Sequence, residues 1–119
     1  MDWMNVLLII LLVAFVVWRM MPTKGVRNIN TTELKKLLND KNMQFIDVRT
    51  QGEFRGNHIR GFKNIPLHEL NSKASQLSKE KEVVVICQSG MRSNKASKLL
   101  KKLGFQSVTN VKGGMNAWS

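Results

Sequence analysis

The sequence predicts an α/β domain, in which helices flank a small and largely parallel sheet, preceded by one transmembrane helix. Two observations support the domain. Short apolar segments alternate with amphipathic segments after residue 29, and this alternation builds parallel sheets. Residues 83–87 read Val-Val-Val-Ile-Cys, which is typical of a strand buried on both faces. The transmembrane helix is indicated by residues 6–18, which form an unbroken apolar run.

We predict that this helix covers residues 3–21 and anchors the protein in a membrane. A helix of this length spans roughly 28 Å, close to the hydrocarbon thickness of a bilayer. Trp3 and Trp18 lie near its ends, where interfacial aromatic side chains are expected. A cleaved signal peptide is the alternative, but it needs positive charge before the run and small residues after it. Asp2 precedes the run and bulky residues follow, so we expect an uncleaved anchor.

The charges that flank the apolar run predict its orientation. Arg19, Lys24 and Arg27 follow the run, whereas Asp2 precedes it. The positive-inside bias then places the N-terminus outside and the rest of the chain in the cytoplasm, as a single-pass protein of the cell membrane. The expected organisation is an anchor over residues 3–21, a linker over 22–28 and one domain over 29–119.

Local patterns predict the elements of the domain. Asn30 with Glu33 has the form of a capping box, so a short amphipathic helix is expected after Asn30. Gly104 follows the apolar stripe of a later helix, as glycines that stop helices do. The other expected elements are, in order, a strand over 43–48, a loop over 51–61 with one helical turn near Glu53 and Phe54, an extended piece over 64–66, a helix over 67–77, the strand over 83–87, a helix over 93–103, a strand over 107–111 and a final turn at Gly113 and Gly114.

Composition limits the chemistry. The net charge of +11 favours anionic partners, although a solubilising surface is the simpler interpretation. The charge is not accompanied by a motif of interleaved basic and aromatic residues, so we expect no nucleic-acid partner. Cys87 is the only cysteine, and His58 and His68 have no paired spacing. We therefore expect neither a disulfide, nor a metal site, nor a cofactor.

Cys87 lies at the carboxyl end of the predicted buried strand, where ligands bind in open α/β sheets. Residues 88–92 form a short loop before the next helix, and such a loop turns its backbone N–H groups towards a bound anion. Gly90 permits this backbone conformation, and Arg92 adds a permanent cation. A thiol in this setting ionises more readily than a free cysteine. A lone cysteine at the end of an apolar strand can also be a small buried hydrophobe.

Residues 87–93, Cys-Gln-Ser-Gly-Met-Arg-Ser, resemble the active-site loop of rhodanese-like sulfurtransferases, which reads Cys-x-x-Gly-x-Arg in single-domain members. Three further matches follow the order of the family's segments, and the resemblance covers residues 29–118. Arg60 and Phe62 depart from it, because the family usually has proline and a small residue there. The further matches are residues 46–49 with 53–54, 58–61 with 64–67, and 104–105 with 113–118.

The resemblance implies a rhodanese-type sulfurtransferase. Cys87 would be the catalytic nucleophile that takes a sulfur from thiosulfate or a similar anionic donor and carries it as a persulfide. The acceptor would be a thiol, small or on a protein. The loop residues implied to bind the donor and the persulfide are Gln88, Ser89, Gly90, Met91 and Arg92. Around the loop we expect Asp47 to fix the loop as a hydrogen-bond acceptor, Arg49 to pair with Glu53, and His58 to be a buried, hydrogen-bonded residue rather than a general base.

Two alternatives remain open from the sequence. Phosphatases and arsenate reductases of the related cysteine-loop type have five residues between cysteine and arginine. Only four separate Cys87 from Arg92 here, which favours a cradle for a sulfur atom over one for a phosphoryl group. The other alternative is a membrane-tethered sulfur carrier, or a partner-binding module, without turnover of its own.

Overall fold

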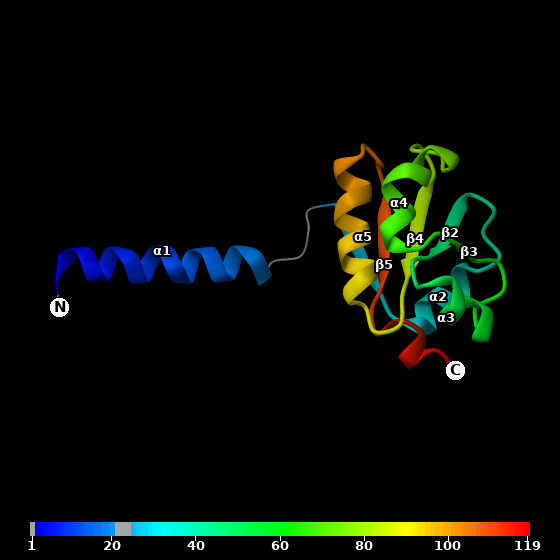
Figure 1. Ribbon diagram of the computed structural model, residues 1–119, viewed down its shortest axis with the longest axis horizontal. Helices are drawn as coiled ribbons and strands as arrows, with labels where there is room; N and C mark the ends of the chain where they lie inside the picture. Colours follow the sequence, from blue (N-terminus) through cyan, green and yellow to red (C-terminus); the bar gives the residue numbers. More distant parts are fainter. Residues whose placement is uncertain (1, 21–24) are drawn as a thin grey trace.

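The computed structural model describes residues 2–20 and 25–119. Its centre is a five-stranded sheet with the order β1-β5-β4-β2-β3, in which every neighbouring pair is parallel (Figure 1). This confirms the predicted α/β class with a parallel sheet. The strands are β1 (Val26–Ile29), β2 (Met43–Asp47), β3 (Lys63–Asn64), β4 (Glu82–Ile86) and β5 (Val108–Val111).

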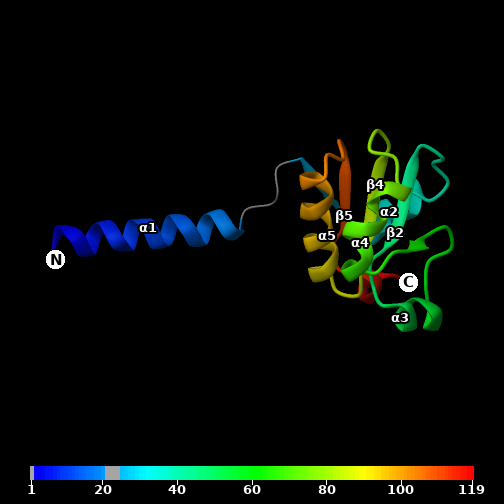
Figure 2. The ribbon, with the colours of Figure 1, turned by 45° about the horizontal axis from the view of Figure 1, so that its top comes forward.

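Helices cover both faces of this sheet. Figures 1 and 2 show α4 and α5 together on one face, and α2 and α3 contribute their apolar side chains to the cluster on the other. The helical elements are α1 (Trp3–Met20), α2 (Thr31–Leu37), α3 (Gln51–Gly56), α4 (Leu67–Lys73), the 3₁₀ turn η1 (Ala74–Gln76), α5 (Met91–Lys102) and the 3₁₀ turn η2 (Gly114–Ala117).

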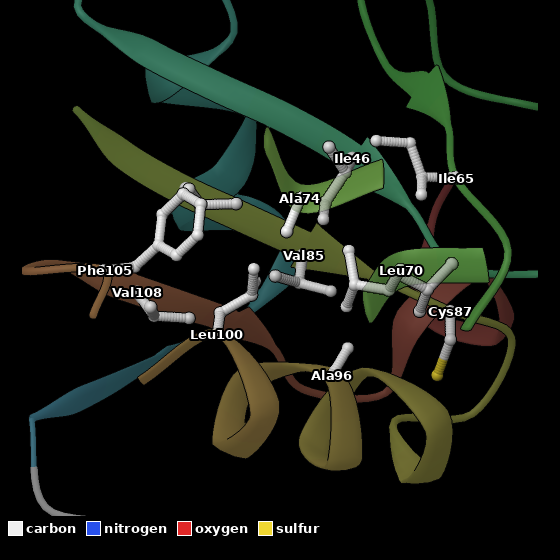
Figure 3. Packing of buried hydrophobic residues seen from close by; sticks show 12 residues of the cluster. Ile46, Ile65, Leu70, Ala74, Val85, Cys87, Ala96, Leu100, Phe105 and Val108 are labelled. Atoms are coloured by element: carbon white, nitrogen blue, oxygen red, sulfur yellow. The ribbon is translucent and has the colours of Figure 1, made fainter. Parts of the chain in front are cut away.

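The core is divided in two by β4. Val83 and Val85 belong to the cluster on the α4 and α5 face, whereas Val84 and Ile86 belong to the cluster on the other face. Successive side chains of a strand point to opposite faces, so a run without polar residues buries both sides. Each fully buried aliphatic side chain stabilises the fold by ~1.5–3 kcal/mol. Figure 3 shows Cys87 at the end of the first cluster, near the start of α5.

Two helices begin at capping boxes. In the predicted one, the Glu33 N–H donates to the Asn30 side chain at 2.8 Å, and the Asn30 N–H donates to Glu33 at 3.3 Å. A second box at Thr50 and Glu53 begins α3, which is a longer helix than the single turn expected there. At the other end of a helix, Gly104 follows α5 with φ +99°, which confirms the predicted stop.

The structure corrects the predicted linker. The sequence predicts a linker over residues 22–28, but residues 26–28 form most of β1, which pairs with β5 at the edge of the sheet. The helix expected over 67–77 ends as an α-helix at Lys73 and continues as η1. The helix expected to begin at residue 93 begins at Met91, directly after Gly90.

The segment predicted as an anchor is helical over Trp3–Met20, and its large apolar side chains from Leu7 to Trp18 are exposed. Residues 21–24, which hold the end of the predicted anchor and the first part of the predicted linker, lie outside the described residues. Among the helices that the structure describes, none combines the length and the apolar character needed to cross a membrane, so the predicted transmembrane helix is not confirmed.

Candidate active site

The candidate site lies at the carboxyl edge of the sheet, between β2 and β4. From β2 the chain continues to β3 on one side, and from β4 it continues to β5 on the other. The connections thus diverge between these two strands, which is where open α/β sheets bind ligands. Asp47 ends β2 opposite Ile86 of β4, and Cys87 follows at once.

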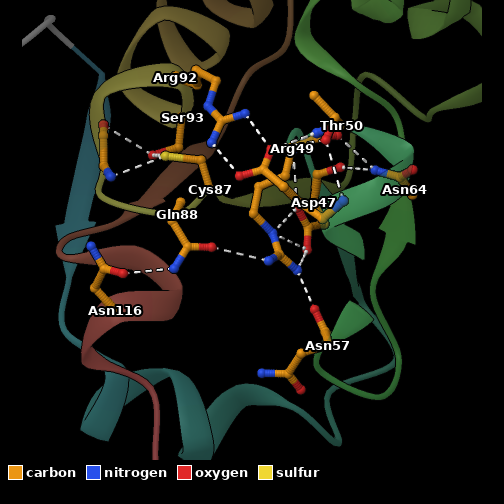
Figure 4. A network of polar contacts seen from close by, with 12 residues as sticks. Asp47, Arg49, Thr50, Asn57, Asn64, Cys87, Gln88, Arg92, Ser93 and Asn116 are labelled. Carbon is orange, nitrogen blue, oxygen red and sulfur yellow. Dashed lines mark hydrogen bonds and ion pairs between the residues drawn. The ribbon is translucent and has the colours of Figure 1, made fainter. Parts of the chain in front are cut away.

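The sulfur of Cys87 is held by the loop that follows it. The Gly90 N–H donates to Cys87 Sγ at 3.0 Å, and the Ser93 hydroxyl oxygen lies 3.3 Å from the same atom (Figure 4). Gly90 has φ +108°, a left-handed conformation that glycine adopts without steric cost. Cys87 and Ser93 are both fully buried. The loop therefore places a backbone donor and a hydroxyl group against the sulfur and shields it from water.

These contacts lower the pKa of the Cys87 thiol. Burial is the largest single influence and raises the pKa, because it disfavours a charged sulfur. The hydrogen bonds of the Ser93 hydroxyl and of the backbone N–H groups of Ser93, Gly90 and Ser89 lower it, and together they outweigh burial. The direction is the one expected from the sequence, and it favours the nucleophilic thiolate.

The 3₁₀ turn η2 fixes the backbone of the loop from behind. The N–H groups of Met115 and Asn116 donate to the carbonyl oxygens of Cys87 and Gln88, at 2.8 and 3.0 Å. In a trans peptide the N–H points away from the carbonyl that precedes it. The Ser89 N–H is therefore directed away from η2, and its hydrogen bond to the sulfur is one of the influences that lower the pKa of Cys87. Gly114 makes the approach possible, because a Cβ there would lie 2.2 Å from the Cys87 carbonyl oxygen.

The role of η2 in fixing the loop was not predictable from the sequence, which indicates only a final turn at Gly113 and Gly114. The available signal was the pair of adjacent glycines, since both residues have positive φ and one meets the carbonyl of Cys87.

A polar network fixes the loop from the side of β2. Asp47 accepts bonds from Arg49, with the closest at 2.8 Å, and both side chains are buried. Arg49 in turn donates to Gln88 Oε1 at 3.1 Å, and Gln88 Nε2 donates to Asn116 Oδ1 at 2.6 Å. Figure 4 shows the Gln88 amide between these two partners. Asp47 therefore acts on the loop through Arg49. Both ends of the Gln88 amide are hydrogen-bonded to protein side chains, so Gln88 positions the loop rather than binding the sulfur-donating substrate.

Arg92 lies in the first turn of α5 and binds Glu53 of α3 through two hydrogen bonds of 2.7 and 3.0 Å. The predicted pairing of Arg49 with Glu53 is wrong, because Arg49 is occupied by Asp47. The Arg92 guanidinium is the main reason that the pKa of Glu53 falls to about 2. Glu53 likewise raises the pKa of Arg92.

Three further residues complete the placement of the predicted site. Ser89 and Met91 of the loop are exposed, and Met91 retains 76% of its accessible surface. His58 is exposed rather than buried, which corrects the prediction; its Nδ1 lies 2.8 Å from the Phe54 carbonyl oxygen and its ring stacks on that of Phe54. Within residues 2–20 and 25–119, no cluster of three or more His, Cys, Asp or Glu side chains could hold a metal ion.

Comparison with known proteins agrees with this geometry. Residues 30–119 match the model of the rhodanese-like domain family. The chain belongs to this family. A putative sulfurtransferase of Bacillus subtilis, YtwF, is 40% identical over 94 residues, which cover 78% of this chain and 90% of the relative. A putative sulfur carrier protein of the same organism, YrkF, is 39% identical over 85 residues, which cover 71% of this chain and 46% of the relative.

A solved structure supports the same assignment. The crystal structure of a rhodanese-like domain protein from Staphylococcus aureus superposes with a TM-score of 0.72 at 36% identity, covering 78% of this chain and 91% of that one. The rhodanese-like fold predicted from the loop and its neighbouring segments is thus confirmed, and relatives of the chain are named as sulfurtransferases or sulfur carriers.

Proposed function

We propose that this rhodanese-like protein is a sulfurtransferase that moves a sulfane sulfur from thiosulfate, or a similar anion, to a thiol through a persulfide on Cys87. One observation carries the proposal: the Cys87 sulfur accepts the Gly90 N–H at 3.0 Å inside a loop whose carbonyl groups are bound by η2. Such a cradle stabilises negative charge on sulfur before and after the transfer.

In the first step the Cys87 thiolate attacks the outer sulfur of thiosulfate. A bond forms between Sγ and that sulfur, the sulfur–sulfur bond of the donor breaks, and its electron pair leaves with sulfite. The Cys87 persulfide anion remains, so atoms and charge balance. Arg92 is about one-third exposed beside the loop, and its guanidinium favours the approach of an anionic donor despite its pair with Glu53.

In the second step an acceptor thiolate attacks the outer sulfur of the persulfide. The bond from Cys87 Sγ to that sulfur breaks, and its electron pair restores the Cys87 thiolate. The loop N–H groups then hold the same charge as at the start. The site is therefore ready for another donor without a change in the loop.

A sulfur carrier without independent turnover is the second candidate. The observation that favours it is the burial of Cys87, because a fully buried sulfur limits access for small acceptors. The similarity to the putative sulfur carrier YrkF is consistent with it. A phosphatase is less well supported, since Gly90 already lies within hydrogen-bond distance of Sγ in this short loop.

We also propose that residues 3–21 attach the protein to the cell membrane, with the N-terminus outside and the domain in the cytoplasm. The proposal rests on the apolar run of residues 6–18, on the exposed apolar side chains of α1, and on the basic residues that follow. Membrane attachment would place the sulfur site close to the inner surface of the membrane.

The proposed transfer is tested by mass spectrometry of the full chain after incubation with thiosulfate. We expect an adduct of about 32 Da on Cys87, which a thiol reductant removes. Cys87→Ser should show no adduct and no thiosulfate:cyanide transfer, while circular dichroism confirms its fold. An adduct that forms but never passes to an added acceptor supports the carrier. Transfer above background in folded Cys87→Ser rules out both.

A further inference from the structure

One side of α5 points away from the sheet and begins at the sulfur loop. Met91, Lys95, Lys98 and Lys102 are all exposed, and their spacing of four, three and four residues places them along a single line of the helix. We call this line the α5 stripe. The opposite side of the helix, Ser93, Ala96, Ser97 and Leu100, is buried against the sheet. Figure 3 shows Ala96 and Leu100 on that inner side.

The three lysines of the stripe carry uncompensated charge. The ion pairs among the described residues are Arg49–Asp47, Lys73–Glu69 and Arg92–Glu53, so none of them uses a stripe lysine. The helix also contains no acidic residue. The stripe is therefore a row of free cations that extends roughly 16 Å from Met91 along the helix.

Met91 gives the stripe an apolar end at the sulfur loop. Among the described residues outside α1, it is the only large hydrophobic side chain that is exposed. It directly follows Gly90, whose N–H donates to Cys87 Sγ. Methionine is flexible and polarisable, and it adapts to different apolar partners at binding surfaces.

We propose that the α5 stripe docks an acidic acceptor protein and places that protein's thiol at Cys87. This inference rests on the proposed function and names the class of acceptor. The row of lysines attracts a row of carboxylates, and Met91 meets an apolar contact beside the thiol. A lipid surface would match the charge, but it would cover the loop and supply no thiol.

Docking compensates for the burial of the sulfur. Because Cys87 is fully buried, a freely diffusing thiol seldom approaches the outer sulfur of the persulfide in the right orientation. A docked acceptor holds its thiolate beside that sulfur, which makes the attack effectively intramolecular. The acceptor leaves with the transferred sulfur as its own persulfide, and the electron pair of the broken bond stays on Cys87. Opposite charges also steer the encounter, so the rate falls with added salt.

The test uses the full chain in nonionic detergent, loaded with sulfur from thiosulfate. The acceptors are cyanide and two synthetic helical peptides with one cysteine each, one carrying glutamates at the spacing of the stripe and the other glutamines. The stripe variant is Lys95→Gln/Lys98→Gln/Lys102→Gln. The control, Lys36→Gln/Lys41→Gln/Lys81→Gln, removes equal charge from exposed positions outside α5.

We expect the stripe variant to lower kcat/KM for the glutamate peptide by ~10-fold, and the control variant to lower it far less. Transfer to the glutamine peptide and to cyanide should change little in either variant. Salt should remove the preference of the unmodified protein for the glutamate peptide. Equal effects of the two variants on the glutamate peptide, as expected if the stripe faces lipid instead, would overturn the docking proposal. Absence of transfer to every acceptor would overturn the proposed function, so the two failures are distinguishable.

Discussion

Arg92 of α5 and Glu53 of α3 form a two-bond ion pair that joins helices packed on opposite faces of the sheet. The same Glu53 side chain completes the capping box of α3 by accepting the Thr50 N–H at 3.1 Å. One carboxylate thus begins α3 and holds the first turn of α5. The orientation of the loop cation is therefore set before a donor arrives.

Glu53→Gln should lower the free energy of unfolding at neutral pH, because it removes the contribution of the ionised Glu53 carboxylate. The pKa of Glu53 falls from 4.5 to about 2 on folding, so its contribution is fully present above pH 4.5 and is lost as pH falls to 2. Because the pair is about one-third exposed, we expect a loss of no more than ~1 kcal/mol at pH 7. Urea unfolding at pH 7 and pH 3 measures the difference in the free energy of unfolding between Glu53→Gln and the unmodified protein.

The matched control is Glu69→Gln, which breaks the ion pair with Lys73 on α4. It should preserve the decrease in stability between pH 7 and pH 3 that Glu53 contributes, whereas Glu53→Gln should reduce this decrease. An unchanged pH dependence in Glu53→Gln would contradict the assignment.

Ser93→Ala should raise the pKa of Cys87, because the Ser93 hydroxyl lies 3.3 Å from Sγ and lowers that pKa. The rate of transfer from thiosulfate should rise with pH as the thiolate forms, and the rise should occur at higher pH in the variant. The ultraviolet absorbance of the thiolate provides a second readout. Ser97→Ala, at a buried position one turn further along α5, is the control and should not change the pKa of Cys87.

Gly114→Ala should damage the loop. Its Cβ would lie 2.2 Å from the Cys87 carbonyl oxygen and 2.8 Å from that of Gln88, so backbone must move. We expect a loss of stability above 2 kcal/mol, on the order of strain plus a lost hydrogen bond, and at least ~10-fold slower transfer. Gly61→Ala controls for positive φ alone, because nothing lies within 4 Å of the added Cβ. That variant should cost ~1–2 kcal/mol and keep its activity.

The unmodified protein should not hydrolyse aryl phosphates in a way that depends on Cys87. Only four residues separate Cys87 from Arg92, one fewer than in the loop of phosphatases, so we expect less room for a phosphoryl group. Inserting one residue between Gly90 and Met91 should also weaken thiosulfate turnover. Hydrolysis that disappears in Cys87→Ser would be evidence for the phosphatase.

The full chain should remain in the membrane pellet after washing with high salt. Salt screens the attraction of lysines to anionic lipid, each worth ~1 kcal/mol, but does not extract an inserted apolar helix. Intact N-terminal residues in the mature protein would argue for an uncleaved segment, and protease outside intact cells should spare the domain. Release by salt, or digestion from outside, would contradict the proposed attachment or orientation.

The sequence predicted those parts of the fold that depend on local signals. The β-branched run of β4, the capping box at Asn30 and the stop at Gly104 are all present. It missed β1, because Val-Arg-Asn-Ile contains too few apolar residues to mark a strand, and its pairing partner β5 lies far along the chain.

Within the site, Cys87 and its loop could be located from spacing, whereas the partners of the charged residues could not. Arg49 and Glu53 are close in sequence, which favoured a local pair. In the folded protein Arg49 instead forms an ion pair with Asp47, and Glu53 forms one with Arg92. The choice depends on which elements meet at the edge of the sheet, and a single sequence does not contain that information.

The two hydrogen bonds by which η2 fixes the loop form late in the synthesis of the chain. Residues 114–116 leave the ribosome after Cys87, so a nascent chain holds its cysteine before the Met115 and Asn116 N–H groups can bind the loop carbonyls. Without these two hydrogen bonds the direction of the Ser89 N–H is not fixed, and the Cys87 thiolate lacks part of its stabilisation. The hydrogen bonds that lower the pKa of the Cys87 thiol are thus complete only once residues 114–116 have been synthesised and have folded against the loop.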